Sequence, residues 1–206
     1  MDFMATNAQL TDYLVNFGVL QTPLIIDAFR TIDRADFVPA EYLAESYGDY
    51  PLPIGYGQTI SQPTTVAFML EKLQPQAGEK ILDIGSGSGW TTALLAQIVG
   101  PKGKVCGVEI VPELADFGRQ NLAKYKFNWA EIKLATAELG YTPLAPFDKI
   151  LASAAAEELP AELLGQLKIG GRLVIPIQNS IWQIDKVAED KFKQQEFPGF
   201  VFVPLV

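Results

Sequence analysis

The sequence of 206 residues contains no histidine and only one cysteine, Cys106. An internal disulfide and catalysis by an imidazole are therefore excluded, and the usual zinc-ligand patterns are missing, so we expect no metal site. No apolar run approaches the roughly 20 residues that a membrane-spanning helix needs, and the first residues lack the basic region of a signal peptide. These absences predict a cytoplasmic protein that does not act at a membrane.

Positive charge is also scarce, because 16 Lys and Arg residues face 24 Asp and Glu residues, for a net charge of -8. Non-specific binding to a phosphate backbone relies on Lys and Arg, so we do not expect nucleic acid as a partner. Internal repeats and low-complexity tracts are missing as well. The length and a hydrophobic fraction of 49% fit one globular domain, residues 1–206, which we expect to be a monomer.

From residue 79 onward, short apolar runs alternate with helical patterns. Strands are predicted at 81–84, 105–108, 132–134, 149–152 and 172–176, and helices at 91–99, from 112 onward and near 160–167. This alternation is typical of βαβ units and predicts an α/β fold, with a mostly parallel, doubly wound sheet covered on both faces. Two further apolar segments, 181–187 and 200–203, with the charged turn 189–193 between them, predict an antiparallel edge hairpin.

Residues 1–78 have a different pattern, with two or three short helices followed by a long loop rich in polar residues and glycine. One predicted helix spans Pro23 to Thr31, and its apolar face is formed by Leu24, Ile25, Ala28 and Phe29. We expect this part to carry the substrate loop and residues 79–206 to form the cofactor-binding sheet.

The first predicted strand of the sheet runs into the glycine loop Asp83-Ile84-Gly85-Ser86-Gly87-Ser88-Gly89. Glycines at the junction of a strand and a helix let the backbone turn sharply and approach a ligand, which indicates a nucleotide-type cofactor. Trp90 stands where dinucleotide-binding loops have their third glycine, and no Gly-Lys-Ser/Thr ending follows. The loop therefore disfavours both a dinucleotide and a nucleoside triphosphate.

Two acidic residues accompany this loop. Glu109 ends the next predicted strand, about 24 positions after Gly85, where related folds place a carboxylate that accepts hydrogen bonds from both ribose hydroxyls. The alternative for Glu109 is to cap the helix that begins near Pro112. Asp83 either steadies the loop by accepting backbone N–H bonds or is a buried polar group with a structural role alone.

A second motif precedes the glycine loop. The segment Pro51-Leu-Pro-Ile-Gly-Tyr-Gly-Gln-Thr-Ile-Ser-Gln-Pro63 resembles the signature of protein-L-isoaspartate O-methyltransferases, and residues 81–90 are similar to the cofactor loop of that family. The resemblance continues through residues 143–150, 154–156, 167–176 and 202–206. It covers nearly the whole chain, although the N-terminal helices match loosely, and it implies a Rossmann-like methyltransferase fold.

The resemblance also implies a reaction, in which a methyl group passes from S-adenosylmethionine to the α-carboxylate of isoaspartyl residues in damaged proteins. S-adenosylhomocysteine is then the product, and isoaspartyl peptides and proteins are the partners. The serine that the family uses in catalysis corresponds to Ser61. The expected cofactor contacts are Thr59, Ile60, Ser61, Asp83, Gly85, Ser86, Gly87, Ser88, Gly89, Glu109 and Thr136.

The missing histidines do not conflict with this chemistry. A carboxylate is already ionised at neutral pH, so the nucleophile needs no base, and catalysis can rest on positioning. Ser61 also fits a purely structural role, since Pro63 and the apolar positions Val66, Met69 and Leu70 predict a helix for which Ser61 would be the N-cap. Both roles can coexist.

One position departs from the family pattern. The family usually has Gly-Asp-Gly where this chain has Ala135-Thr136-Ala137, so Thr136 offers only a hydroxyl at the adenine end of the cofactor. Two alternatives therefore stay open. One is a methyltransferase of the same fold that acts on another substrate, although the Asn/Asp-Pro-Pro-Tyr motif of exocyclic-amine methylation is missing. The other is a non-catalytic binding protein with weakened cofactor affinity.

Overall fold

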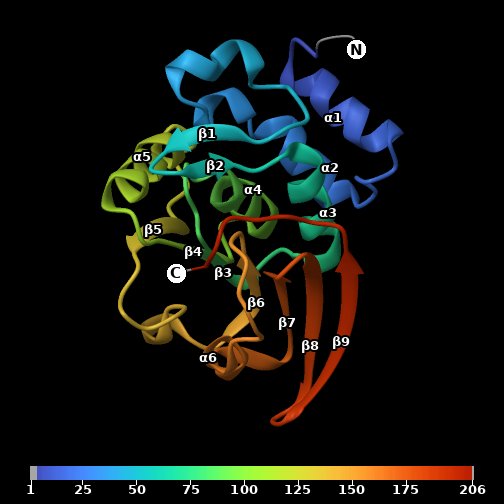
Figure 1. The fold of residues 1–206 in the computed structure, drawn as a ribbon, viewed down its shortest axis with the longest axis vertical. Coiled ribbons are helices and arrows are strands. Elements are labelled where there is room, and N and C mark those ends of the chain that lie inside the picture. Colours follow the sequence, from blue (N-terminus) through green and yellow to red (C-terminus); the bar gives the residue numbers. More distant parts are fainter. Residues whose placement is uncertain (1–3, 206) are drawn as a thin grey trace.

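The computed structural model describes residues 4–205 and contains a seven-stranded sheet. Its strands are β3 (Lys80–Ile84), β4 (Lys104–Glu109), β5 (Ala130–Leu134), β6 (Phe147–Ala152), β7 (Leu167–Ile177), β8 (Ser180–Ala188) and β9 (Lys191–Pro198). They lie in the order β5-β4-β3-β6-β7-β8-β9 (Figure 1). The first five strands of this order pair in parallel, whereas β8 and β9 add an antiparallel edge. The predicted α/β sheet is thus confirmed.

Helices and a small hairpin complete the fold. The α-helices are α1 (Asn7–Asn16), α2 (Pro23–Thr31), α3 (Pro63–Leu73), α4 (Trp90–Val99), α5 (Pro112–Ala123) and α6 (Ala161–Gly165). The 3-10 helices are η1 (Arg34–Phe37), η2 (Ala40–Glu45) and η3 (Thr142–Leu144), and the hairpin consists of β1 (Leu52–Gly55) and β2 (Gln58–Ile60). Within residues 4–205, none of the helices has the length and hydropathy needed to cross a membrane.

The central strands β3, β4 and β6 are largely buried on both faces, as their near-continuous apolar sequences predict. Because neighbouring residues of a strand point to opposite faces, Ile81 joins a core cluster with residues of α1 to α5, while Leu82 joins a second cluster with Leu163 of α6. Figure 1 shows α1, α2, α3 and α4 on one side of the sheet and α6 on the other. The carboxyl ends of the parallel strands therefore form an edge between the two layers.

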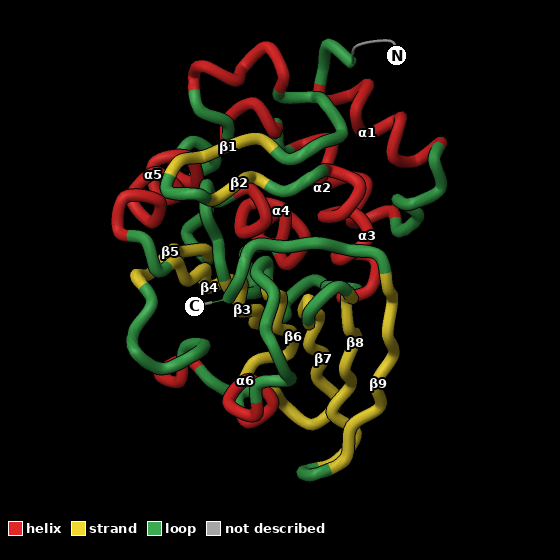
Figure 2. Tube along the Cα trace, in the orientation of Figure 1, coloured by secondary structure: helices red, strands yellow, loops and turns green. Residues whose placement is uncertain are grey.

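The second strand of the edge hairpin differs from the prediction. It is β9, Lys191–Pro198, and not residues 200–203, which leave the sheet and cross back toward the carboxyl ends of the central strands (Figure 2). Most side chains of β9 are exposed because it is an edge strand, so its sequence is polar and lacks an apolar run. The apolar residues 200–203 pack elsewhere, and the expected strand there was wrong.

Two glycines allow the glycine loop to approach α5 closely. Gly89 has a φ of +89°, and a Cβ atom on it would lie 2.9 Å from the carbonyl oxygen of Gly118. A Cβ atom on Gly118 would in turn lie 2.7 Å from the carbonyl oxygen of Gly87. Such distances are shorter than van der Waals contact, so only glycine fits at both positions.

We predict that Gly118→Ala lowers the free energy of unfolding by about 1–3 kcal/mol, because overpacking against the Gly87 backbone outweighs the better helix propensity of alanine. The control is Gly165→Ala in α6, where an added Cβ meets no atom within 4 Å. Its stability should be unchanged or higher. Urea unfolding of both variants measures the difference, and equal effects would contradict the close packing of loop and helix.

Candidate active site

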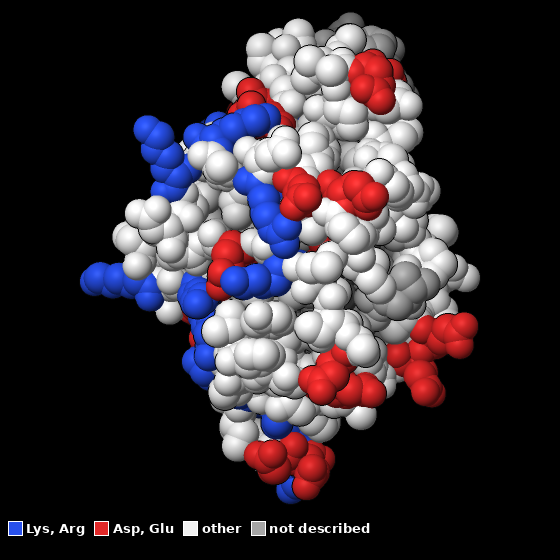
Figure 3. All heavy atoms as spheres, turned by 90° about the vertical axis from the view of Figure 1, so that its left-hand side faces the viewer, with Lys and Arg blue, Asp and Glu red and all other residues white. Residues whose placement is uncertain are grey.

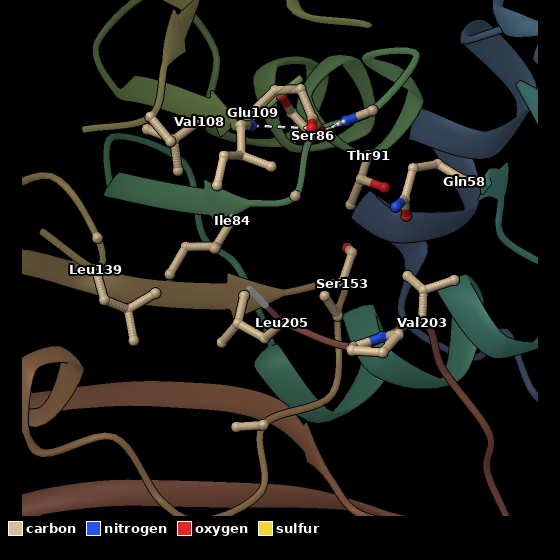
Figure 4. A pocket seen from close by; sticks show the side chains of 18 of the residues that line it. Gln58, Ile84, Ser86, Thr91, Val108, Glu109, Leu139, Ser153, Val203 and Leu205 are labelled. Carbon is tan, nitrogen blue, oxygen red and sulfur yellow. Dashed lines mark hydrogen bonds between the residues drawn. The ribbon is translucent and has the colours of Figure 1, made fainter. Parts of the chain in front are cut away.

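A cavity of about 500 Å³ opens at the carboxyl ends of β3, β4, β5 and β6. This is the edge where open parallel sheets bind their ligands, and the volume suits a cofactor-sized molecule. Its wall combines segments that are far apart in the chain, as the side chains of Gln58, Ser86, Glu109, Ser153 and Leu205 illustrate (Figure 4).

Most of the residues that the sequence singled out meet at this cavity. Those on its wall are Thr59, Ile60, Ser61, Gly85, Ser86, Gly87, Ser88, Glu109 and Thr136. Asp83 and Gly89 do not line it. Asp83 lies behind the glycine loop, and Gly89 is the N-cap of α4 and contacts α5. The structure therefore separates nine residues able to touch a ligand from two that support the loop.

The glycine loop turns sharply and is anchored by β4. Gly85 and Gly87 have φ angles of +75° and +50°, a region that side chains rarely adopt. The N–H groups of Gly85 and Ser86 donate to the carbonyl oxygen of Val108, at 2.9 and 3.0 Å. A Cβ atom on Gly87 would lie 3.1 Å from Ile54 Cδ1 of β1, so this glycine also lets the loop approach the β1–β2 hairpin.

Glu109 connects the glycine loop to the start of α5. Its side chain lies at the cavity wall (Figure 4). The Oε2 atom accepts from Gly87 N–H at 2.8 Å, and the Oε1 atom accepts from Ile110 and Val111 N–H at 2.9 and 3.0 Å. Val111 immediately precedes α5, so Glu109 both caps this helix, as one interpretation predicted, and lies at the cavity wall. A carboxylate has about four acceptor sites, so these three bonds leave one, on Oε2, for a ligand hydroxyl, and not the two that the sequence led us to expect.

Ser86 adds a second polar atom to the wall. Its hydroxyl is buried and has no hydrogen-bond partner among residues 4–205. Buried hydroxyls in folded proteins nearly always have a partner, so a ligand in the cavity would supply one for Ser86.

Asp83 is fully buried beneath this loop. Its Oδ2 atom accepts a hydrogen bond from the Thr92 hydroxyl of α4 at 2.6 Å, whereas Oδ1 has no partner among the described residues. The N–H groups of Gly85 and Ser86 donate to Val108 instead, so Asp83 supports the loop through α4. The pKa of Asp83 is raised from 3.8 to about 7, mainly by burial, while the Thr92 hydrogen bond lowers it in part and the charge of Glu109 adds to the increase.

Ser61 lies between β2 and α3, at the end of the β1–β2 hairpin. The expectation that Ser61 is the N-cap of α3 was wrong, because Gln62 occupies that position and makes no side-chain cap bond. The cap of α3 is instead provided by Asp49, whose carboxylate accepts from Thr64 N–H at 2.9 Å and from the Thr64 hydroxyl at 2.7 Å. Within residues 4–205, the Ser61 hydroxyl has no recorded partner and stays available at the cavity wall.

The C-terminal segment forms a part of the cavity that the sequence did not indicate. Ala155 N–H donates to Val203 and Leu205 N–H donates to Ala155, both at 2.8 Å. These bonds place the side chains of Val203 and Leu205 on the wall (Figure 4). The sequence pattern predicted residues 200–203 as part of the edge hairpin and indicated no role for Leu205 in the site.

Charge around the cavity is negative. Glu138, Glu157, Glu158 and Glu162 line it together with Glu109. On the side of the molecule where α5 and β5 lie, basic side chains gather toward one edge of the view, whereas acidic ones are spread over the rest of the face (Figure 3). Basic residues of α5 and β5 form ion pairs with acids, as in Lys133–Glu131 and Arg119–Asp116. Among residues 4–205, no group of three His, Cys, Asp or Glu side chains has a metal-binding arrangement.

Comparison with solved structures identifies the class of this site. The beta-aspartate methyltransferase (PCMT) of Plasmodium falciparum, solved in complex with S-adenosyl-L-homocysteine, superposes with a TM-score of 0.89 at 25% identity, covering 98% of this chain and 99% of that one. An S-adenosylmethionine-dependent O-methyltransferase from Thermotoga maritima shares the fold more distantly, with a TM-score of 0.51 at 23% identity, covering 69% and 62% of the two chains. The fold is that of an S-adenosylmethionine-dependent methyltransferase.

Sequence comparison narrows the class to a family. The family model for protein-L-isoaspartate(D-aspartate) O-methyltransferase matches residues 5–206. The protein-L-isoaspartate O-methyltransferase of Methanopyrus kandleri is 39% identical over 209 aligned residues, which cover 99% of this chain and 92% of the relative. That of Myxococcus xanthus is 46% identical over 166 residues, covering 81% and 76%. The chain belongs to this family, as the resemblance implied.

The buried acid Asp83 leads to a prediction about pH. Its folded pKa of about 7 lies above the ordinary 3.8, so the folded state holds the proton more tightly than the unfolded state does. The stabilisation is complete below about pH 3.8 and is lost as the pH rises through 7. We predict that wild type loses stability relative to Asp83→Asn across this window.

Free energies of unfolding measured from pH 4 to pH 7 check this expectation. The control is Asp116→Asn, which changes an exposed acid on α5 and should keep the slope of the wild type. Parallel pH profiles for wild type and Asp83→Asn would contradict a raised pKa at this position.

Proposed function

We propose that this chain transfers the methyl group of S-adenosylmethionine to the α-carboxylate of L-isoaspartyl residues in proteins and peptides. The observation that carries the proposal is that Ser61 lines the same cavity as the glycine loop and Glu109. Membership of the family supports both the cofactor and the substrate.

The residues of the cavity fit the cofactor. Glu109 retains one acceptor site for a ribose hydroxyl, and the Ser86 hydroxyl lacks a protein partner. Thr136, Leu139 and Ile110 would border the adenine, with the Thr136 hydroxyl as the polar group at that end. When bound, S-adenosylmethionine supplies an electrophilic methyl group on a sulfonium centre.

The work of the protein is then to position a carboxylate and to exclude water. Thr59 and Ser61 would donate hydroxyl hydrogen bonds to the substrate carboxylate, which needs no base because it is ionised at neutral pH. Val203 and Leu205 contribute apolar surface that keeps water from the reacting groups. Positioning alone can supply about 7–11 kcal/mol of barrier reduction, so this chemistry does not depend on histidine.

The proposal is tested by labelled-methyl transfer to an isoaspartyl peptide and to its normal aspartyl twin. The expected result is labelling of the isoaspartyl peptide alone, because the two peptides differ only in where the free carboxylate lies. Equal labelling would reject the substrate. Binding of S-adenosylmethionine in a calorimetric titration, without transfer to either peptide, would instead favour a methyltransferase for another substrate or a binding protein.

We predict that Ser61→Ala lowers turnover on the isoaspartyl peptide at least about tenfold, since a hydrogen bond to a charged group contributes about 1.5–3 kcal/mol. The free energy of unfolding should change by less than about 0.5 kcal/mol, because Ser61 does not cap α3. Asp49→Ala is the contrasting variant, and it should lose about 1 kcal/mol of stability with the cap. Wild-type turnover in Ser61→Ala would remove Ser61 from the reaction.

A further inference from the structure

Arg34, in η1, is a buried arginine that forms no ion pair with a carboxylate of residues 4–205. Its exposed fraction is 0%, and it donates to four backbone carbonyl groups. Nη1 bonds to Ser46 at 2.6 Å and to Gly48 at 3.2 Å, and Nη2 bonds to Tyr50 at 3.1 Å and to Ser61 at 3.2 Å. The guanidinium group therefore ties both ends of the segment that contains the β1–β2 hairpin.

The charge of Arg34 is retained in this environment. The pKa of Arg34 is lowered from 12.5 to about 10 by burial, after the negative charge of Asp49 has offset part of the decrease. The side chain is thus protonated at neutral pH and needs polar partners, because an isolated buried charge is strongly unfavourable. Four carbonyl groups accept from the two Nη groups, whereas Nε has no partner among the described residues. Breaking the four bonds would leave the buried charge uncompensated.

The guanidinium group also lies over a ring in the other half of the cavity wall. Its Cζ atom lies 5.3 Å from the ring centroid of Trp90, the first residue of α4 after the glycine loop. Trp90 is held in turn by an edge contact with Phe29 of α2, at 5.6 Å between ring centroids. Arg34 therefore lies between the segment that ends in Ser61 and the helix that follows the cofactor loop.

We propose that Arg34 is a positioning residue, which holds the Ser61 backbone at a fixed place relative to Trp90 and the glycine loop so that the Ser61 hydroxyl meets the substrate carboxylate. This role rests on the proposed function of Ser61. It requires both the fork of two Nη groups and the flat guanidinium face. Lysine has neither, since its ammonium group is a point donor that cannot stack on a ring.

The first test compares Arg34→Lys with Arg30→Lys, which changes an exposed arginine of α2 whose recorded ion pair is with Asp12. We expect Arg34→Lys to lower kcat on the isoaspartyl peptide at least about tenfold, with KM for S-adenosylmethionine within about twofold of wild type. Arg30→Lys should behave as wild type. An unchanged kcat in Arg34→Lys would overturn the proposal.

A double-mutant cycle separates positioning from general stability. If Arg34 acts through Ser61, Arg34→Lys should lower kcat by less than about twofold in a Ser61→Ala background, because residues that act as a unit are not additive. The same fold-loss in both backgrounds would show that Arg34 is only structural.

Two readouts are independent of activity. Hydrogen exchange of backbone amides in residues 52–60 should be at least about tenfold faster in Arg34→Lys than in Arg30→Lys, because the hairpin opens more easily once its ends are released. Unchanged exchange would contradict the clamp. If Arg34→Lys does not fold, NMR of the wild-type chain provides the test. The hydrogen-bonded Nη–H protons of Arg34 should exchange with solvent more slowly than the Nη–H protons of Arg30. Equal exchange would overturn the proposal.

These outcomes are distinguishable from a failure of the proposed function. Equal methylation of the isoaspartyl and aspartyl peptides by wild type would reject the substrate, whereas the exchange experiments still decide whether Arg34 holds the hairpin.

Discussion

The architecture of the cavity depends on the three backbone hydrogen bonds that the Glu109 carboxylate accepts. The carboxylate accepts N–H bonds from the glycine loop and from the start of α5, so two turns at neighbouring strand ends share one acceptor. The parallel pairing of β3 with β4 makes this possible, because Ile84 lies beside Val108 and the two strands end at the same edge. The site for a nucleotide-type cofactor is therefore a consequence of sheet register as much as of the glycines themselves.

Three buried ionisable side chains lie around this edge, and they differ in the groups that stabilise them. Glu109 is stabilised as an anion by backbone N–H groups, and Arg34 as a cation by backbone carbonyl groups. Asp83 has one side-chain bond and an oxygen without a partner, and its raised pKa reflects how poorly its charge is solvated. The first two groups connect segments that are distant in the chain, whereas Asp83 supports the loop from beneath.

The chemistry of the site agrees with a chain that has no histidine. A carboxylate nucleophile and a sulfonium leaving group require orientation and a dry environment rather than proton transfer. Hydroxyl groups, backbone dipoles and apolar side chains provide these, and all three line the cavity. The segment that closes it, residues 203–205, is joined to Ala155 by backbone hydrogen bonds rather than by a strand of the main sheet.

The alternation of strands and helices, the glycine loop and Glu109 could be predicted from the sequence alone, because periodicity and glycine spacing are local properties and parallel strands bring their ends together. The prediction of Ser61 rests on the family resemblance. Contacts between distant segments determine that β9 is the edge strand, that Asp49 rather than Ser61 caps α3, and that Val203 and Leu205 line the cavity. The contacts of Arg34, on which its proposed role rests, are likewise a property of the tertiary structure. These features rest on contacts between distant segments, on carbonyl groups that every residue carries, and on an exposed strand without an apolar pattern, none of which the sequence encodes locally.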